Sequence, residues 1–495
     1  MPELEKLQMY IDAEGHDPAS GAYIETFNPY TGKAWGLVPR GNADDVNCAV
    51  AAAKKAFVSG EWPKLTATAR GHLLRRLGDL VAENADRLGE IEVRDNGKLI
   101  AEMALQTKYA AQWYYYFGGL ADKIEGGVLP IDKADHFAYT SHEPLGVIAM
   151  IIPWNSPLLL LTWKLAAALA AGNTVVVKPS EFTSASALAF ARLVEQAGFP
   201  KGVFNVVTGY GQEAGEPLVT HPDVAKIAFT GGSQSGTRVY EKAAAGLKKV
   251  SLELGGKSPN IVFADCHMEN AVKGAVSGIF AATGQTCIAG SRLLVQESIH
   301  DEFVDKIVAF AKTAKMGNPM SMETQVGPVT TPPQFEKILG YMDVARADGA
   351  ECVLGGQKSV RPECGDGWFI EPTIYTGVTN SMRIAQEEVF GPVLSIIPFK
   401  DDEEAVEIAN DVVYGLAAGL WTSDIRRAIE IPKRIQAGTI WVNTYRAVSY
   451  MAPFGGYKSS GLGRESGQDA IYEYMQTKTV WISTATETAN PFVLR

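Results

Sequence analysis

The stretch that decides the fold runs from Gly146 to Lys178 and reads GVIAMIIPWNSPLLLLTWKLAAALAAGNTVVVK. Two apolar, β-branched runs, Val147–Ile152 and Thr174–Lys178, flank a helical pattern over Leu158–Ala171. A strand, a helix and a second apolar strand predict a right-handed crossover between parallel strands that are buried on both faces. This unit therefore predicts a doubly wound α/β domain.

The alternation of strands and helices continues along the chain. Further strands are predicted at Phe204–Thr208, Lys226–Thr230 and Val250–Leu254. The intervening helices are predicted at Ser184–Ala197, Gln212–Val219 and Ser233–Ala245. A second alternating series comprises Val393–Phe399, Asp402–Val412, Ala417–Thr422, Ile425–Ile435 and Thr439–Asn443. Two α/β units therefore share the chain, and the cleft between them is the default place for a ligand site.

The region before Gly146 is helical in pattern. Apolar residues at i, i+3 and i+4 predict helices over Asp44–Phe57, Thr66–Val93 and Ala101–Lys123.

Composition narrows the class of protein. The chain has 495 residues and a formal net charge of −11, with 46% hydrophobic and 20% charged residues. This balance is typical of a folded globular protein and argues against a nucleic-acid partner, which requires clustered Lys and Arg. No apolar run reaches the roughly 18 residues that a membrane span needs, so no membrane partner is expected.

The five cysteines form neither a CxxC pair nor a metal-ligand spacing. The sequence therefore predicts no disulfide framework and no metal site. With an acidic N-terminus that lacks the apolar segment of a signal peptide, this pattern favours the cytoplasm.

A glycine-rich turn closes one predicted strand and opens a helix, reading FTGGSQSG over Phe229–Gly236. Paired glycines and the free N–H groups of a helix N-terminus suit a pyrophosphate. The segment is not GxGxxG, and Thr237-Arg238 excludes a P-loop. On these residues alone, an ordinary strand-to-helix turn is an equally good interpretation.

Four other segments hold reactive or polar groups beside predicted strands or helices. They are FAATGQTC ending at Cys287, LELGGK containing Glu253, IIPWN ending at Asn155, and EEVFGP containing Glu388. The thiol could be a nucleophile, Glu253 a general base whose pKa burial raises, and the amide an oxyanion donor. The alternatives are a packing cysteine, a glutamate that faces water and, for EEVFGP, a solvated turn.

Taken together with KPSE at Lys178–Glu181 and PFGGYKSSGLGRE at Pro453–Glu465, these segments resemble the NAD(P)-dependent aldehyde dehydrogenases. SLELGGK is similar to the glutamate signature of that family and FAATGQTC to its cysteine signature. The resemblance covers nearly the whole chain, with the motifs in the same order and spacing.

The resemblance implies a catalytic role for three residues. Cys287 would attack an aldehyde, and Asn155 with the Cys287 backbone N–H would hold the oxyanion of the hemithioacetal. After hydride transfer to NAD, Glu253 would activate the water that hydrolyses the thioester to a carboxylic acid.

The resemblance also implies a cofactor site. Lys178 and Glu181 would hold the adenosine ribose, and Glu388 the nicotinamide ribose. NAD is the expected cofactor and NADP the weaker alternative, because its phosphate would face the Glu181 carboxylate. The expected site comprises Ile152, Trp154, Lys178, Glu181, Gly211, Gly231, Gly232, Ser233, Gly236, Glu388 and Phe390.

A substrate tunnel is implied as well, although no particular aldehyde is indicated. The expected lining is Ser156, Leu160, Trp163, Thr286, Ile288, Val448 and Phe454. Ser156 is small and could admit a bulky or cyclic aldehyde, while Arg446 at the tunnel mouth could attract a carboxylate.

For the whole chain, the resemblance implies a Rossmann-like NAD-binding domain, a second α/β catalytic domain and a small β oligomerisation arm. The expected bounds are 1–122 and 145–255 for the NAD-binding domain, with 456–476 packed back on it, 256–455 for the catalytic domain, and 123–144 and 477–495 for the arm. A homodimer or homotetramer follows from such an arm.

Three other functions stay open at this point. A CoA-acylating aldehyde dehydrogenase would replace water by a thiol. A cofactor-free cysteine hydrolase would need a histidine partner for the thiol, and no histidine lies in a motif. A catalytically silent structural or binding protein could share the fold.

Overall fold

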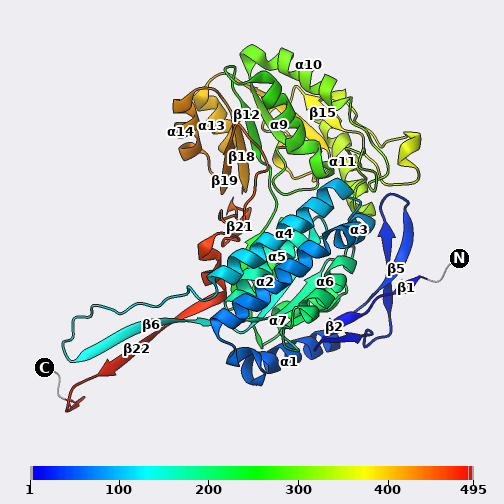
Figure 1. Ribbon diagram of the computed structural model, residues 1–495. Coiled ribbons are helices and arrows are strands. Elements are labelled where there is room, and N and C mark those ends of the chain that lie inside the picture. Colours follow the sequence, from blue (N-terminus) through cyan, green and yellow to red (C-terminus); the bar gives the residue numbers. More distant parts are fainter. Residues whose placement is uncertain (1–3, 489, 493–495) are drawn as a thin grey trace.

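The computed structural model describes residues 4–488 and 490–492. Two α/β units lie one above the other, and a long two-stranded arm extends from the lower one (Figure 1). The predicted 1–122 segment and the predicted arm segment 477–495 each include residues outside the described part. The domain bounds stay a prediction.

The lower unit is built on an eight-stranded sheet with the order β21-β11-β10-β7-β8-β9-β2-β3. Its parallel strands are β7 (Val147–Ile152), β8 (Thr174–Pro179), β9 (Phe204–Val206), β10 (Val224–Thr230) and β11 (Lys249–Glu253). Antiparallel strands complete the edges: β2 (Met9–Ile11), β3 (Glu14–His16) and β21 (Gly461–Leu462). The chain runs from β7 to β8 and β9 on one side and places β10 and β11 on the other. The strand order therefore reverses between β7 and β10.

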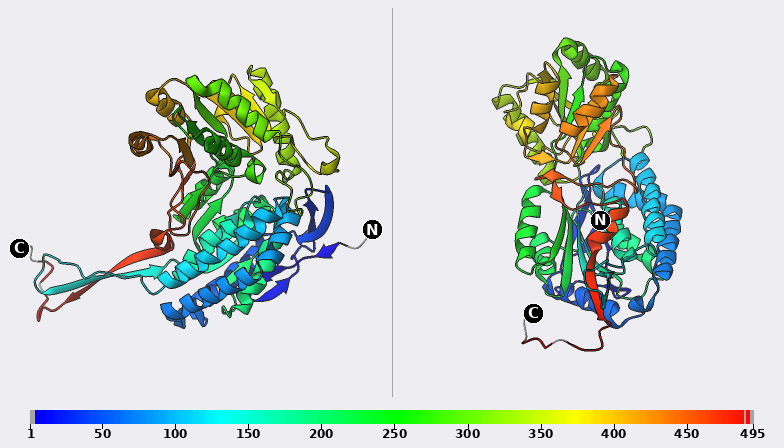
Figure 2. Two further views of the ribbon diagram at one scale, coloured as in Figure 1. Left: turned by 45° about the horizontal axis from the view of Figure 1, so that its top comes forward. Right: turned by 90° about the vertical axis from the view of Figure 1, so that its left-hand side faces the viewer.

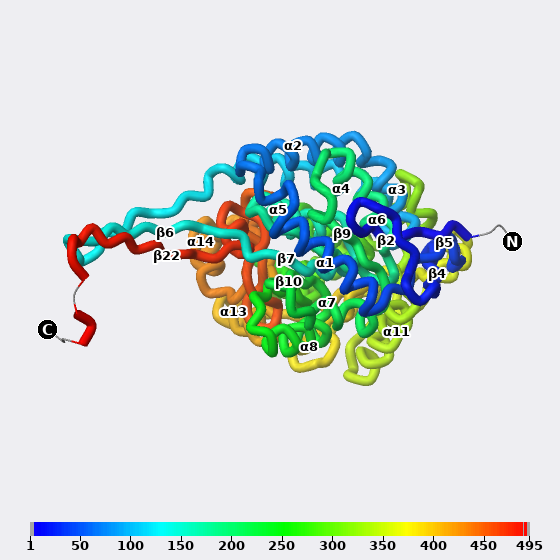
Figure 3. Tube along the Cα trace, turned by 90° about the horizontal axis from the view of Figure 1, so that it is seen from below, coloured from blue at the N-terminus to red at the C-terminus, as the bar shows by residue number. Residues whose placement is uncertain are grey.

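Helices cover both faces of this sheet (Figure 3). One face packs against α2 (Ala67–Glu83), α4 (Ile100–Leu120), α5 (Pro157–Ala170) and α6 (Ala185–Gln196). The other packs against α1 (Ala43–Ser59), α7 (Glu216–Thr220) and α8 (Ser233–Ala244). Along β7, Ile148 and Met150 enter the first core while Val147 and Ala149 enter the second, so apolar residues fill both faces as a parallel sheet requires.

The upper unit contains a seven-stranded sheet with the order β14-β15-β16-β13-β12-β18-β19. Its strands are β12 (Pro259–Val262), β13 (Arg292–Gln296), β14 (Glu351–Leu354), β15 (Thr373–Thr376), β16 (Val393–Phe399), β18 (Ala417–Trp421) and β19 (Thr439–Val442). Its helices are α9 (Met268–Phe280), α10 (His300–Ala311), α11 (Pro332–Ala347), α12 (Arg383–Gln386), α13 (Asp402–Asn410) and α14 (Ile425–Arg434). The α/β class and both alternating series are confirmed.

The arm consists of β6 (His136–Pro144) and β22 (Met475–Ser483), which pair antiparallel along their whole length. Figure 2 shows them side by side, projecting away from both units. Smaller sheets join β1 (Glu5–Lys6), β4 (Tyr23–Asn28) and β5 (Lys33–Pro39), and join β17 (Tyr414–Gly415) to β20 (Tyr457–Lys458).

Two helix predictions were wrong in detail. The predicted helix Thr66–Val93 is two helices, α2 and α3 (Ala85–Asn96). They part at Asn84, where the backbone leaves the helical conformation with φ −102° and ψ 13°. The Asn84 N–H and the Asn84 side chain both donate to the Leu80 carbonyl, at 3.0 and 2.8 Å, and so cap the end of α2. The predicted helix Gln212–Val219 is a π-type turn over Gly211–Gly215 followed by α7.

The described residues include no helix with the length and apolar character that crossing a bilayer would need.

Candidate active site

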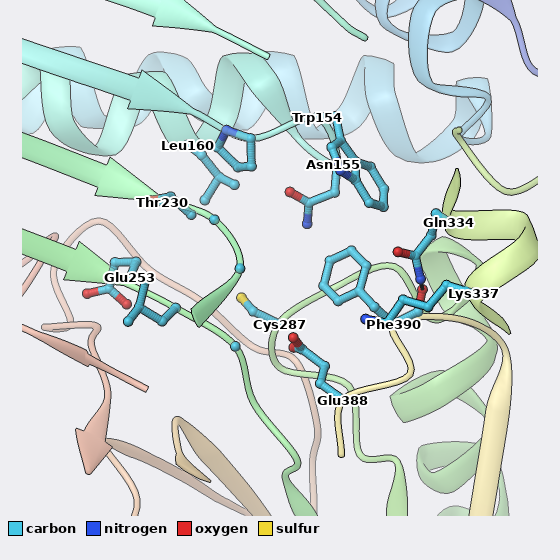
Figure 4. Close-up of a pocket in the computed structure, with 15 residues that line it drawn as sticks. Trp154, Asn155, Leu160, Thr230, Glu253, Cys287, Gln334, Lys337, Glu388 and Phe390 are labelled. Carbon is cyan, nitrogen blue, oxygen red and sulfur yellow. Dashed lines mark hydrogen bonds between the residues drawn. The ribbon is translucent and has the colours of Figure 1, made fainter. Parts of the chain in front are cut away.

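The helices that follow β7 and β10, α5 and α8, pack on opposite faces of the sheet where the strand order reverses, which is where open α/β sheets bind ligands. A cavity of about 160 Å³ opens there, between the two units. Figure 4 shows the Cys287 sulfur and the Asn155 amide pointing into it from opposite sides, with the Phe390 ring alongside. The lining residues are Pro153, Trp154, Asn155, Leu160, Thr230, Gly231, Gly232, Glu253, Leu254, Gly255, Cys287, Gln334, Lys337, Glu388 and Phe390.

The loop before Cys287 holds an unusual backbone. Ala282 and Thr283 have positive φ angles of 54° and 55°, a region that non-glycine residues seldom occupy. The Ala282 N–H donates to Glu102 Oε1 at 3.1 Å, and the Thr283 hydroxyl donates to the Gly327 carbonyl at 3.1 Å. Such strain persists where the surroundings hold it, and it is concentrated at functional sites.

The Cys287 thiol is half-buried and electrostatically opposed to ionisation. Burial, with the charges of Glu253 and Glu388, raises the pKa of Cys287 to about 12, while Lys98 acts in the opposite direction. At neutral pH the thiol is therefore protonated, and a reaction through the thiolate requires a proton acceptor or added positive charge.

Asn155 lies between the end of β7 and the start of α5. Its side-chain Nδ2 donates to the Gln285 carbonyl at 3.0 Å, which joins the amide to the cysteine loop. The Leu158 N–H, in the first turn of α5, donates to Glu92 Oε1 at 2.8 Å. Asn155 is thus held against the cysteine loop and precedes a helix start that Glu92 anchors, and its amide can donate to an oxygen bound at Cys287.

Glu253 ends β11 and is 4% exposed. Neither carboxylate oxygen has a hydrogen-bond partner within the described part of the chain. Burial and the charge of Glu465 raise the pKa of Glu253 well above its usual range, while Lys164 and Arg464 lower it. The expected direction of the shift is confirmed, and its cause includes a buried neighbour that sequence reasoning missed.

Lys164 and Glu465 form a buried ion pair beside Glu253. The Lys164 ammonium also donates to Thr230 Oγ1 at 2.6 Å, at the end of β10. Lys164 lies within an otherwise apolar helix, so a helical periodicity gives no sign of this role. Figure 4 shows the Glu253 carboxylate at the edge of the cavity, turned away from the Cys287 sulfur.

The opposite wall of the cavity carries Glu388 and Phe390. Glu388 Oε1 accepts from the Gly256 N–H at 2.9 Å, and a Cβ at Gly255 would lie only 2.5 Å from Glu388 Oε2. The Phe390 ring meets the Trp154 ring edge-on at 5.2 Å. Both side chains therefore have defined positions beside the thiol.

Gln334 and Lys337 also line the cavity, and neither was predicted from the sequence. They lie three residues apart on α11, so they share one helix face. Gln334 Nε2 donates to the carbonyls of Val389 and Phe390 at 2.8 and 3.0 Å. These two residues lie on a helix, away from any glycine-rich turn or strand end, so no sequence motif marks them as part of a site.

A second, larger hollow of about 710 Å³ adjoins the cavity through Trp154, Gly231 and Gly232. Lys178 Nζ lies 3.5 Å from Glu181 Oε2 in it, and both Ile152 and Gly211 contribute to the lining. Residues that were not expected also line it: Ser180, Phe182, Tyr210, Arg238 and Lys242. An extended ligand can thus reach from this hollow to Cys287.

The remaining two residues of the expected cofactor set lie in the first turn of α8, where Ser233 follows the Gly232 N-cap. Neither Ser233 nor Gly236 lines the hollow. A Cβ at Gly236 would lie 2.3 Å from Leu254 Cδ2, so this glycine allows α8 to pack closely on the sheet.

The expected tunnel residues surround the other side of Asn155. Leu160 lines the cavity, and Trp163 packs edge-on against Phe454 with ring centroids 4.9 Å apart. Thr286 and Ile288 flank Cys287 in the chain, and Val448 is half-buried against the apolar core. Trp113, Tyr109 and Tyr450 extend the aromatic surface from α4 and the 443–452 loop.

Two basic residues lie near this end. The Lys98 ammonium donates to Ser156 Oγ at 2.8 Å, and Arg446 Nη1 lies 3.5 Å from the Ser277 carbonyl. Lys98 was not predicted, because it lies in a loop before a helix and far in sequence from every motif.

Comparison with known proteins adds independent findings. The family model described as "Aldehyde dehydrogenase family" matches residues 16–480. (Z)-2-((N-methylformamido)methylene)-5-hydroxybutyrolactone dehydrogenase of Acinetobacter baylyi is 47% identical over 495 residues, which are 99% of this chain and 100% of that protein. Human mitochondrial aldehyde dehydrogenase is 45% identical over 485 residues, 97% of this chain and 93% of that one.

Solved structures are similar over nearly the whole chain. Betaine aldehyde dehydrogenase from Staphylococcus aureus in complex with NAD+ has a TM-score of 0.97 at 39% identity, covering 98% of this chain and 97% of that one. The NAD+ complex of an aldehyde dehydrogenase from Bacillus cereus has a TM-score of 0.95 at 41% identity, covering 97% of each chain.

Proposed function

Because the chain belongs to the aldehyde dehydrogenase family, we propose that the cavity at Cys287 is where it oxidises an aldehyde to a carboxylic acid with NAD. The protein is an NAD-dependent oxidoreductase that acts on aldehydes. The observation that carries the assignment of the site is that Cys287, Asn155 and Glu253 all line one cavity, which continues into the larger hollow.

The residues of the hollow fit NAD. Glu181 can accept hydrogen bonds from the adenosine ribose, and the start of α8 at Gly232 presents free N–H groups to a pyrophosphate. Nothing lies within 4 Å of where a Cβ of Gly232 would be, which leaves room for a close approach. Glu388, which accepts from the Gly256 N–H, would hold the second ribose. Bound NAD supplies the hydride acceptor.

The first step forms a bond between the Cys287 sulfur and the aldehyde carbon. The thiol gives its proton to solvent, and the carbonyl oxygen becomes an oxyanion that the Asn155 amide and the Cys287 N–H would hold. Donors already in place stabilise this charge without reorganisation, and losing one typically lowers kcat by about 10²–10³.

The second step hydrolyses the thioester that remains on Cys287 after hydride loss. Glu253 removes a proton from the attacking water, and the acid leaves as the thiol is released. A carboxylate with a raised pKa is a better base than a solvated one, which suits a buried Glu253. The adjacent Lys164–Glu465 pair sets the local charge around this proton acceptor.

No observation favours the alternatives. Among the described residues that line the cavity there is no histidine to activate a hydrolase thiol. Cys287, Glu253 and Asn155 are all present, so a silent protein is not indicated. The direct test measures NADH formation with NAD and a panel of aldehydes. An inactive protein across the panel would contradict the proposal.

The cofactor preference is expected to depend on Glu181. NADP would bring a phosphate toward the Glu181 carboxylate, so NAD should be favoured by about 10- to 150-fold in kcat/KM. Lys178 lies 3.5 Å from the Glu181 carboxylate and partly offsets this repulsion. Glu181→Gln should reduce the preference for NAD, mainly by raising kcat/KM for NADP.

The matched control is Glu213→Gln, because Glu213 lines the same hollow but is held by Arg40 at 2.6 Å. It should leave the preference unchanged. Equal kcat/KM for NAD and NADP in the wild type would rule out the role given to Glu181.

The substrate class is proposed to include aldehydes that carry a carboxylate. Arg446 is close enough to Lys98 to lower the pKa of that ammonium, so two basic side chains share this end of the site. The Acinetobacter relative is named for a 5-hydroxybutyrolactone. Such a ring opens to a chain bearing both an aldehyde and a carboxylate, and the small Ser156 would leave space for either form.

Arg446→Ala is expected to lower kcat/KM for a semialdehyde acid by about 3- to 10-fold, with little change for its neutral analogue, because a partly screened charge is worth about 1 kcal/mol. Steady-state rates for both substrates in the two proteins give the ratio. If the ratio stays the same, Arg446 does not select for charge.

The proposal also covers the oligomeric state and the cellular compartment of the protein. Phe137 of β6 and Trp481 and Ile482 of β22 expose apolar surface on the arm, which supports a homodimer or homotetramer formed through it. The five cysteines are free thiols, which suits a reducing cytoplasm. Light scattering after size exclusion distinguishes a monomer from either assembly.

A further inference from the structure

Lys98 is a buried lysine whose role the reaction above does not use. Its side chain is 3% exposed, and its ammonium donates to Ser156 Oγ at 2.8 Å. The acceptor is a neutral hydroxyl rather than a carboxylate. Burying an ammonium is costly because it loses its hydration.

The segment containing Lys98 is connected to the cysteine loop by hydrogen bonds. The Lys98 N–H donates to Asn96 Oδ1 at 2.9 Å, and the Asn96 carbonyl accepts from the Thr330 hydroxyl at 2.6 Å. The Thr330 N–H donates to Gln285 Oε1 at 2.9 Å, and the Gln285 carbonyl accepts from Asn155.

The residue after Asn155 is Ser156, which binds the Lys98 ammonium, so these contacts close into a ring. The ring joins the α3–α4 loop, the loop after β7 and the loop that ends at Cys287. The Lys98 ammonium is therefore bound to Ser156, the residue next to the proposed oxyanion donor Asn155. Asn155 is itself bound to the cysteine loop through Gln285.

The charges that face Lys98 come from four elements. They are Glu92 of α3, Glu102 of α4, Arg446 of the loop after β19, and the Cys287 thiol. Burial and Arg446 lower the pKa of Lys98, and the carboxylates raise it, with a resulting value of about 8. The side chain is thus charged at neutral pH and loses its charge in mildly alkaline solution.

The charges that face Cys287 are mostly unfavourable to a thiolate. Glu253 and Glu388 raise the pKa of the thiol, and Lys98 lowers it. A thiolate that forms between two carboxylates needs a cation nearby, and Lys98 is tethered in the position to supply it.

We propose that Lys98 is a positioning residue for the reaction at Cys287, whose ammonium, held by Ser156, favours the thiolate of Cys287. This rests on the proposed function only in taking Cys287 as the nucleophile. A purely structural Lys98, present to balance Glu92 and Glu102, is the alternative.

The test measures the rate of Cys287 alkylation by iodoacetamide in the full-length protein, from about pH 6 to about pH 10, using the mass of the Cys287 peptide. Wild type, Lys98→Met, Lys98→Arg and Lys108→Met are compared. Lys108 is an exposed lysine on α4, so it provides the same substitution without contact with the site.

Lys98→Met should slow alkylation about tenfold below pH 8, because losing a nearby cation raises the pKa of the Cys287 thiol and lowers its thiolate fraction. Above that pH the wild-type lysine loses its own charge, so the two profiles should converge. Lys98→Arg keeps the charge and should stay fast to high pH, while Lys108→Met should match the wild type.

Two outcomes would overturn the proposal. One is a Lys98→Met profile that coincides with the wild type. The other is a profile displaced by the same factor at every pH, which indicates a loosened structure. If Lys98→Met does not fold, Ser156→Ala removes the tether instead. Slower alkylation below pH 8 then supports the proposal, and an unchanged profile overturns it.

This measurement needs neither an aldehyde nor NAD. A wild type that fails to oxidise aldehydes would therefore contradict the proposed function without deciding the role of Lys98. If the wild type oxidises aldehydes but its alkylation profile matches that of Lys98→Met at every pH, only the role of Lys98 is overturned.

Discussion

Replacing Cys287 by alanine is expected to abolish aldehyde oxidation, with a loss in kcat of at least about 10⁴-fold, because removing a nucleophile removes the covalent route. NAD should still bind, since Cys287 lines the small cavity and not the larger hollow that Lys178 and Glu181 share. Steady-state NADH formation and a separate titration of NAD binding measure the two effects.

The other four cysteines provide the controls for this variant. Cys48 and Cys352 are exposed, Cys266 is half-buried and Cys364 is buried, and all four are absent from the cavity. Each should tolerate Ser or Ala with little loss of activity. Full activity in Cys287→Ala would disprove the mechanism, whatever the controls show.

Replacing Glu253 by glutamine is expected to separate the two half-reactions. The change keeps the size of the side chain but removes the base, so acylation and hydride transfer should survive while hydrolysis of the thioester stalls. The measurement is a pre-steady-state trace of NADH. A burst close to one NADH per site, then turnover slowed by about 10²–10⁴-fold, is expected, with added acyl mass on Cys287.

Burial strengthens this prediction, because neither Glu253 oxygen has a hydrogen-bond partner in the described residues and glutamine loses no contact there. Glu241→Gln, on the exposed face of α8, is the matched control and should behave as the wild type. Equal loss of the burst and of steady turnover would instead place Glu253 before hydride transfer, in the activation of the thiol.

Most of the fold could be predicted from local pattern. The run Val147–Ile152 is a strand with the same bounds in sequence and structure, because an apolar, β-branched run can be buried on both faces only in a covered parallel sheet. The break at Asn84 could not be predicted, since the apolar periodicity continues through it. Only the structure shows that the Asn84 backbone leaves the helical conformation, with its side chain bound to the Leu80 carbonyl.

The chemistry of the site could also be predicted in part. A recognisable sequence segment contains each of the residues Cys287, Glu253 and Asn155. The structure brings all three to one cavity. Their effect on one another could not be predicted. The thiol is opposed by Glu253 and Glu388, and this depends on distances across three separate segments.

The sequence by itself determined the α/β class, the family resemblance and the reactive groups, because these depend on residue types and short spacings. The tertiary structure alone decided which groups share a charge environment. Lys98 lies nearly two hundred residues before Cys287 in the chain, and Lys164 lies three hundred and one residues before Glu465. Electrostatic energy depends on distance in space and on burial. Both are set only when the chain folds and brings the segments around the reversal of strand order, between β7 and β10, together.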